Sequence, residues 1–305
     1  MTAPDSLPQD YQKGWKSYEQ QIALLKTRGL TVADPAVAVK CLGHLNYYRF
    51  SGYCLAFEQS RHQFSPGVTF EQVWASYEFD RVLRDLVTEA LESVEVDFRT
   101  AVANHFGKVH GAFGHVSPGN FFKTFKHQTW LDKLHDETAR SSELFVTHFR
   151  HRYRQFPDLP VWAATEIASF GSLSRMYSGM YKIDQKAICC RYGLQPGDLE
   201  TWMHHFVYVR NLCAHHARLW DRVWAIKPSL PAAAAWKPLY LPGSDRLFVT
   251  LLALNFILRR CSAVANFVAD WRKRVESLLA KPPATEAALA KMGLTEQWRA
   301  QPLWR

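Results

Sequence analysis

Apolar residues recur at steps of three or four positions along most of the chain, which is the period of amphipathic α-helices. The longest such pattern covers residues 69–106, with apolar side chains at Val73, Tyr77, Val82, Leu86, Ala90, Val94, Phe98 and Val102. Charged residues lie on its polar side, where Glu95 precedes Arg99 by four residues, a spacing that weakly stabilises a helix. No segment alternates apolar and polar residues convincingly in the manner of a strand. The pattern predicts an all-α fold.

Several helix boundaries are marked by residues with special backbone preferences. Asp34 followed by Pro35 is typical of a helix start, and Gly29 after the pattern "SYEQQIALLKTR" is typical of a helix end. Residues 107–126 are rich in Gly, Pro and Ser, which predicts a loop. We predict an N-terminal helical extension over residues 1–60, a helical domain over 61–280 and a tail over 281–305. One long helical pattern over 245–280 supplies an additional C-terminal helix.

The sequence has few features of a membrane-spanning segment, a signal peptide or a metal site. The longest apolar run, Leu247 to Leu258, is shorter than the ~20 residues that cross a bilayer. The first residues, "MTAPDSLPQDYQKGWKSYEQQ", lack the apolar core of a signal peptide. The six cysteines show neither metal-ligand nor disulfide-framework spacing. These features predict a cytoplasmic protein with free thiols, no membrane partner, no metal and no cofactor.

The charge balance is strongly basic. The formal net charge is +9 and the isoelectric point is about 9.3. Such an excess favours a polyanionic partner such as nucleic acid, although basic proteins without anionic partners are common.

The stretch "YVRNLCAHHARLWDR", residues 208–222, combines arginine, asparagine and histidine within a few positions. On a continuous helix Asn211, His215 and Arg218 share one face, and the long side chain of Arg210 can swing onto it. Histidine titrates near pH 6.5 and therefore transfers protons at neutral pH, while arginine stabilises charge on phosphate oxygens. The set suits phosphodiester cleavage without a metal, in which the 2′-hydroxyl of RNA is the nucleophile. The alternative is a solvated helix face that happens to carry histidines.

The same stretch resembles the signature of the Abi-like family, the bacterial abortive-infection proteins of the AbiD/AbiF type. Further similar segments follow in the expected order and include "QIALLKTRGL", "HLNYYRFSGY", "LFVTHFRHRY" and "LPVWAATEIASFGSLSRMY". The resemblance runs from about residue 20 to residue 222. It implies membership of the HEPN superfamily of helical RNases, whose motif is arginine, a polar residue and then histidine. The implied fold is a HEPN-like helical bundle.

The resemblance also implies a function and the residues that carry it. Arg210 would bind the scissile phosphate, His215 would act as acid or base, and Asn211 would position both, while His216 either substitutes or flanks. The implied activity is a metal-independent endoribonuclease in abortive infection or a toxin–antitoxin system. RNA is then both substrate and candidate antitoxin, and a homodimer would supply a second histidine. Two alternatives stay open: a non-catalytic protein that holds a regulatory noncoding RNA, and a protein-interaction module that senses a phage component.

Arg99 and His105 form a second pair of the same kind and are a candidate second half-site within one chain. Alternatively, Arg99 pairs with Glu92 or Glu95, and His105 lies at the end of its helix, where the helix dipole favours a cation.

Other residues carry weaker signals. The segment "THFRHRYRQF" interleaves basic and aromatic residues and predicts RNA contacts from Arg150, Arg152, Arg154 and Tyr153, together with His216 and Arg218; the alternative is a solvated basic helix. A zinc site among His204, His205, His215 and His216 is disfavoured, because adjacent histidines on a helix cannot both face one ion. We expect Glu166 to be buried in a structural role; the alternatives are that it accepts a hydrogen bond from an active-site arginine or histidine, or that it caps a helix. We expect Trp162, Phe170 and Gly171 to set helix packing and a tight bend.

Overall fold

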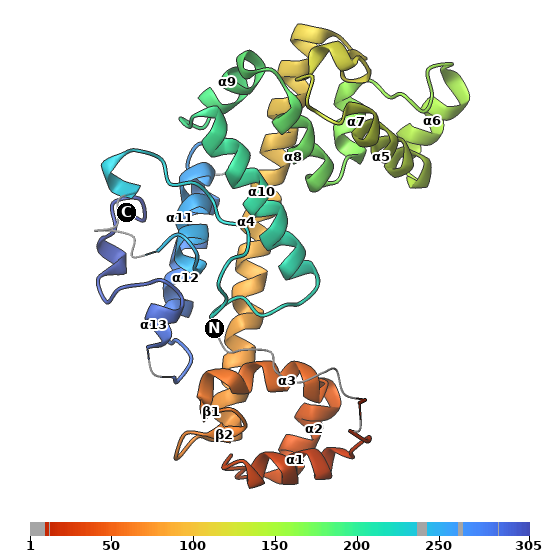
Figure 1. The fold of residues 1–305 in the computed structure, drawn as a ribbon. Helices are drawn as coiled ribbons and strands as arrows, with labels where there is room; N and C mark the ends of the chain where they lie inside the picture. Colours follow the sequence, from red (N-terminus) through yellow and green to blue (C-terminus); the bar gives the residue numbers. More distant parts are fainter. Residues whose placement is uncertain (1–9, 12, 237–242, 262–264, 286) are drawn as a thin grey trace. The chain divides into compact units, whose positions relative to one another are not determined.

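The computed structural model describes residues 10, 11, 13–236, 243–261, 265–285 and 287–305. The expectation for the first 21 residues therefore falls partly outside the described ones, which do not include residues 1–9 and 12. The all-α prediction is confirmed, since the regular secondary structure of the described residues consists of helices and one short two-stranded hairpin (Figure 1). The chain divides into two compact units, Met1–Glu78 with Pro283–Thr285, and Phe79–Pro282 with Glu286–Arg305.

The first unit holds three short helices and the hairpin: α1 (Tyr18–Thr27), α2 (Pro35–His44), α3 (Tyr47–Cys54), β1 (Glu58–Ser60) and β2 (Gln63–Phe64). Asp34 caps α2 by accepting hydrogen bonds from the backbone N–H groups of Ala36 and Val37, with Pro35 in the first turn as predicted. Gly29 follows α1 with a φ of 93°, which suits glycine. The Phe50 and Phe70 rings stack 4.8 Å apart in the core.

The second unit is built on α4 (Phe70–His110), whose first residues belong to the first unit. This helix confirms the longest apolar pattern of the sequence and extends it by four residues. The other helices are α5 (His127–Arg140), α6 (Leu144–Arg152), α7 (Val161–Ile167), α8 (Phe170–Gly179), α9 (Lys182–Cys190), α10 (Pro196–Ala214), α11 (Leu247–Leu258), α12 (Ala265–Leu279) and α13 (Ala288–Lys291). Helix α8 packs against both α5 and α10.

The C-terminal part differs from the predicted single helix over 245–280. Two helices are present, α11 and α12, and α11 ends at Leu258. Helix α11 is apolar on all sides and almost wholly buried, which explains a hydrophobic run without amphipathic period. Among the described residues, no helix combines the length and the apolar character needed to cross a membrane.

A buried ion pair on α4 fixes the segment that follows α10. Asp80 accepts hydrogen bonds from the backbone N–H groups of Leu219 and Trp220 at 2.9–3.1 Å. Arg84, one turn along α4, donates to Asp80 at 2.7 Å, and both side chains are buried. A buried carboxylate with this set of donors is well satisfied, and it holds the chain just beyond the histidines of the candidate motif.

Candidate active site

The predicted motif lies at the C-terminal end of α10, where the chain turns sharply. The N–H of Ala217 bonds to the carbonyl of Leu212, and the N–H of His216 bonds to the carbonyl of Cys213. This pair of bonds is a Schellman motif, and it requires a left-handed residue, here His216 with a φ of 53°. The helix therefore ends at Ala214, and His215 is its C-cap.

This turn corrects one prediction. Arg218 lies beyond the helix and does not share a helical face with Asn211 and His215. It pairs instead with Asp221 at 2.8 Å. Asp221 is largely buried, and burial raises the pKa of its carboxyl group, an effect that Arg218 opposes. Arg218 thus belongs to the turn structure.

Asn211 and His215 remain close together in the chain and open to solvent. The N–H of His215 bonds to the carbonyl of Asn211, so the two residues keep a helical relation across the cap. Both side chains are exposed. Within the described part of the chain, neither side chain has a hydrogen bond or an ion pair. Their polar atoms are available to a ligand.

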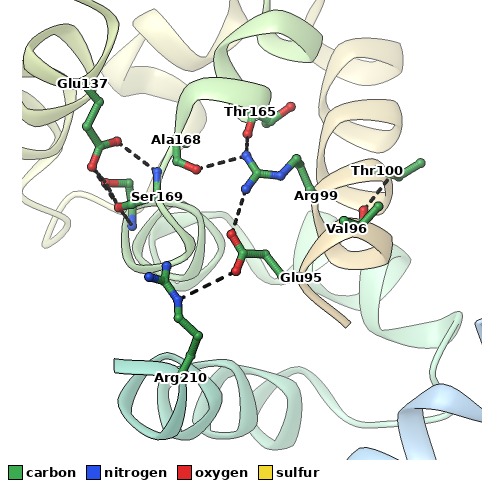
Figure 2. A network of polar contacts seen from close by, with 10 residues as sticks. Glu95, Val96, Arg99, Thr100, Glu137, Thr165, Ala168, Ser169 and Arg210 are labelled. Atoms are coloured by element: carbon green, nitrogen blue, oxygen red, sulfur yellow. Dashed lines mark hydrogen bonds and ion pairs between the residues drawn. The ribbon is translucent and has the colours of Figure 1, made fainter. Parts of the chain in front are cut away.

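Arg210 points from α10 toward Glu95 on α4 (Figure 2). Its Nε lies 3.9 Å from Oε2 of Glu95, and this buried nitrogen has no hydrogen-bond partner. The side chain is 33% exposed. No other polar partner of its guanidinium is present among the residues that the structure describes. Arg210 is therefore held by charge alone and retains most of its donors for an anion.

Arg99 contacts the other oxygen of Glu95, and its environment is different (Figure 2). It donates to Oε1 of Glu95 at 2.8 Å, to the carbonyl of Ala168 at 3.0 Å and to the carbonyl of Thr165. The side chain is only 11% exposed. These bonds tie α4 to the end of α7 and give Arg99 a structural role. The sequence left open that Arg99 pairs with Glu92 or Glu95, and the structure shows the pair with Glu95.

His105 does not join Arg99. Its Nε2 lies 2.8 Å from Oδ1 of Asp184 on α9, and Nε2 of His110 lies 3.1 Å from Oδ2 of the same buried carboxylate. Helix α4 continues to His110, so His105 is inside the helix and not at its end. The structure brings Arg99 and Arg210 together through Glu95, but it does not assemble an Arg99/His105 half-site.

A comparison with known families shows to which family the chain belongs. The model of the family described as "Abi-like protein" matches residues 40–221, which is more than half of the 305 residues. The chain belongs to the Abi-like family. Membership points to a role in abortive infection, a defence against phage. No curated protein and no solved structure matches the chain.

The matched region of this Abi-like chain contains the whole of α10 and the residues around it. Glu95 also lies within it. Sequence reasoning noted Glu95 only as a helix-stabilising neighbour of Arg99, because the approach of Arg210 from another helix leaves no trace in sequence spacing. Asp80 was missed for the same reason, since the backbone N–H groups that it binds, those of Leu219 and Trp220, lie about 140 residues away.

Histidines near the motif of the Abi-like chain have separate roles. His205 is buried, with Nδ1 2.7 Å from the carbonyl of Ile226 and Nε2 2.9 Å from the hydroxyl of Thr250. The carbonyl can only accept, so Nδ1 carries the proton. Burial lowers the pKa of His205 to about 4, which keeps the ring neutral. Among the described residues, no group of three or more His, Cys, Asp or Glu is placed to hold a metal ion.

The basic segment predicted to contact RNA forms α6 and the residues after it. Arg150, Arg152, Tyr153 and Arg154 are all exposed. Arg150 donates to the carbonyl of Ala139 at 3.3 Å and lies over the Phe156 ring at 5.1 Å. For Arg152 and Arg154, no ion pair or hydrogen bond occurs within the described residues. These two arginines are open to a polyanion.

The region of α7 and α8 corrects three expectations, for Glu166, Trp162 and Gly171. Glu166 is exposed, not buried. Trp162 is 54% exposed and does not serve core packing alone, whereas Phe170 is fully buried as expected. Gly171 lies inside α8 and not at a bend.

Proposed function

We propose that this Abi-like protein is a metal-independent endoribonuclease of the HEPN type, a cytoplasmic toxin that acts in abortive infection and is restrained until needed. The observation that carries the proposal is the end of α10. There an incompletely paired arginine, Arg210, stands five residues before an exposed histidine, His215, that has no polar partner in the described chain.

The reaction follows from the chemistry of these groups. His215 removes the proton of the RNA 2′-hydroxyl, the 2′-oxygen forms a bond to phosphorus, and the bond from phosphorus to the 5′-oxygen breaks. The leaving 5′-oxygen takes up a proton. Arg210 stabilises the charge that develops on the phosphate oxygens, and Asn211 orients the reacting groups. The products are a 2′,3′-cyclic phosphate and a 5′-hydroxyl.

Within the described residues, the motif of one chain supplies one histidine without a polar partner, His215, and base and acid are two roles. We propose that a homodimer brings two copies of the motif together, so that His215 of each copy serves one role. The net charge of +9 supports RNA as the substrate and as a candidate restraining partner.

A second function is compatible with the same geometry. Arg210, with its incompletely paired guanidinium, and the exposed His215 can each hold a phosphate without cleaving the RNA. In this alternative the protein holds a regulatory noncoding RNA through the same basic surface.

The test uses purified protein stripped of nucleic acid and incubated with labelled RNA in the presence of EDTA. We expect cleavage with cyclic-phosphate ends, reduced ~10²–10⁴-fold in His215→Ala and ~10²–10³-fold in Arg210→Ala. His204→Ala is the matched control, because His204 is an exposed histidine on the same helix. RNA binding without cleavage by the wild type would favour the RNA-holding alternative, and equal cleavage by all variants would remove the motif from the mechanism.

A further inference from the structure

Trp162 is the largest side chain of α7, and the protein covers only part of it. It lies in the first turn of this helix, between the buried residues Val161 and Ala163. The N–H of Val161 bonds to the carbonyl of Ala112 at 2.7 Å, which fixes the backbone at this point. More than half of the Trp162 side chain is nevertheless exposed. Because its backbone is fixed and its indole is exposed, Trp162 offers an aromatic surface on which another ring can stack.

The indole borders a groove of about 560 Å³ between α4 and α7. This volume lies in the range of ~300–1,000 Å³ that small-molecule sites occupy. Gly107 on α4 forms part of the wall. A Cβ atom at this position would lie 3.3 Å from Val161 and 3.4 Å from the Trp162 ring. The absence of a side chain therefore lets the ring lie close to α4, while the rest of the indole faces the groove.

The wall contributed by α4 is polar. Thr100, Asn104 and Lys108 follow one another at four-residue steps, so they form one row along the helix. Asn104 and Lys108 are exposed, and no hydrogen bond or ion pair of their side chains occurs in the described chain. Glu166 faces them from α7. The groove thus offers an aromatic ring, an amide, a carboxylate and a cation.

We propose that this groove binds one unpaired base of a single-stranded RNA. The base stacks on Trp162, Asn104 and Glu166 recognise its edge, and Lys108 binds a phosphate of the same strand. Because a carboxylate accepts hydrogen bonds, Glu166 can bind the exocyclic amino group of adenine, cytosine or guanine. The inference rests on the proposed action on RNA and adds a subsite that the arginine–histidine motif does not contain.

The groove is linked to the candidate active site through α7. Glu166 lines the groove, and the preceding residue, Thr165, accepts a hydrogen bond from Arg99. Arg99 in turn shares the Glu95 carboxylate with Arg210. A base in the groove would therefore be held by the same framework that positions Arg210.

The test measures binding of a fluorescent single-stranded oligoadenylate of about ten nucleotides, a length within the site sizes of single-strand binders. The full chain carrying His215→Ala is the parent, so that cleavage does not interfere. Trp162→Ala, Trp162→Phe and Lys108→Ala are made in this parent. Trp15→Ala is the matched control, because Trp15 is 87% exposed and does not line the groove. Circular dichroism and thermal unfolding verify that each variant is folded.

We expect Trp162→Ala to weaken binding about tenfold, and Trp162→Phe only about threefold, because phenylalanine retains part of the stacking surface. Trp162→Ala leaves the salt dependence of binding unchanged, whereas Lys108→Ala lowers its slope by about 0.7. Binding by Trp162→Ala within about twofold of the parent overturns the subsite, while the proposed function stands. Displacement of the RNA by submillimolar AMP identifies a free-nucleotide pocket and also overturns it. A parent that does not bind the oligoadenylate overturns the subsite, and the proposed function is refuted only if the wild type also fails to cleave or bind labelled RNA.

Discussion

Glu95 on α4 and Arg210 on α10 form an ion pair across 3.9 Å, and the second oxygen of Glu95 accepts a hydrogen bond from Arg99 at 2.8 Å. One carboxylate thus stands between two guanidinium groups that would otherwise repel each other. Among the described residues, Arg99 has three hydrogen-bond partners, whereas Arg210 has a single ionic contact and an unpaired Nε. Two chemically identical side chains therefore have different roles.

We expect this difference to separate stability from activity. Arg99→Lys loses the guanidinium whose Nη1 bonds to two carbonyl groups while its Nη2 bonds to Glu95. Buried acceptors left unpaired cost about 1–3 kcal/mol in free energy of unfolding. Arg210→Lys removes no hydrogen bond, so its free energy of unfolding should change by less than about 0.5 kcal/mol. RNA cleavage should fall strongly in Arg210→Lys, because a lysine cannot bind phosphate through two parallel bonds.

Urea unfolding and RNA cleavage measured on the same preparations check this prediction. The reverse pattern, a stable Arg99→Lys and an unstable Arg210→Lys, would contradict the assignment of roles.

His216 is held in a left-handed conformation that favours glycine. His216→Gly should therefore raise the free energy of unfolding by about 1 kcal/mol, since it relieves the φ of 53° in the cap of α10. Thermal unfolding measures the gain. Gly29→Ala is the opposite control, because Gly29 has a φ of 93° after α1, and alanine there should destabilise. A destabilised His216→Gly would mean that the imidazole contributes more than the backbone costs.

Much of the fold was predictable, because it depends on local signals. The apolar period of α4 and the Asp34-Pro35 start of α2 are properties of a few neighbouring residues. The end of α10 is different. Asp80 holds the backbone of Leu219 and Trp220 from a distant part of the chain, and no local signal shows that the helix stops at Ala214. Arg218 was misplaced for this reason.

In the candidate site, too, features set by neighbouring residues were predictable and features set by distant residues were not. Arg210, Asn211 and His215 were recognised because they are close together in sequence. The pairing of His105 with Asp184 depends on the packing of α9 against α4, which the helical period of α4 does not specify. The exposure of Trp162 was also missed, because hydrophobic residues in a short helix are usually buried.

Acid should destabilise the protein through its buried histidines. Burial lowers the pKa of His205 and of His115 to about 4 each, from an ordinary value of 6.5. Below pH 6.5 the unfolded chain therefore binds more protons than the folded one, and the free energy of unfolding falls as the pH drops toward 4. For His205 alone the loss reaches roughly 3 kcal/mol at most. The contribution is fully present above pH 6.5.

Urea unfolding at pH 7.5 and at pH 5 measures this loss. In His205→Gln the difference between the two pH values should shrink, although the variant is less stable at pH 7.5 because the contacts to Ile226 and Thr250 are altered. An unchanged pH dependence in His205→Gln would show that other groups cause the acid effect. His204→Gln, a change at the exposed neighbour, should leave both values as they are.

The exposed arginines after α6 should contribute to RNA binding through charge. Arg152 and Arg154 have no protein partner among the described residues, whereas Arg150 bonds to Ala139 and lies over Phe156. Replacing both Arg152 and Arg154 by alanine should lower the salt slope of single-stranded RNA binding by about 0.7 for each phosphate that the protein no longer neutralises. The free energy of unfolding should stay the same, since neither side chain bonds to another part of the described chain.

Fluorescence anisotropy at several salt concentrations gives the slope. The control is Lys26→Ala with Arg61→Ala, which removes the same charge from two exposed positions in the first unit. If both double variants lower the slope equally, only the net charge matters and the α6 surface does not bind RNA. If the α6 variant alone changes the slope, RNA binds at this surface. Independently of RNA, Arg150→Ala should lower the free energy of unfolding and Arg152→Ala should not, because only Arg150 contacts Ala139 and Phe156.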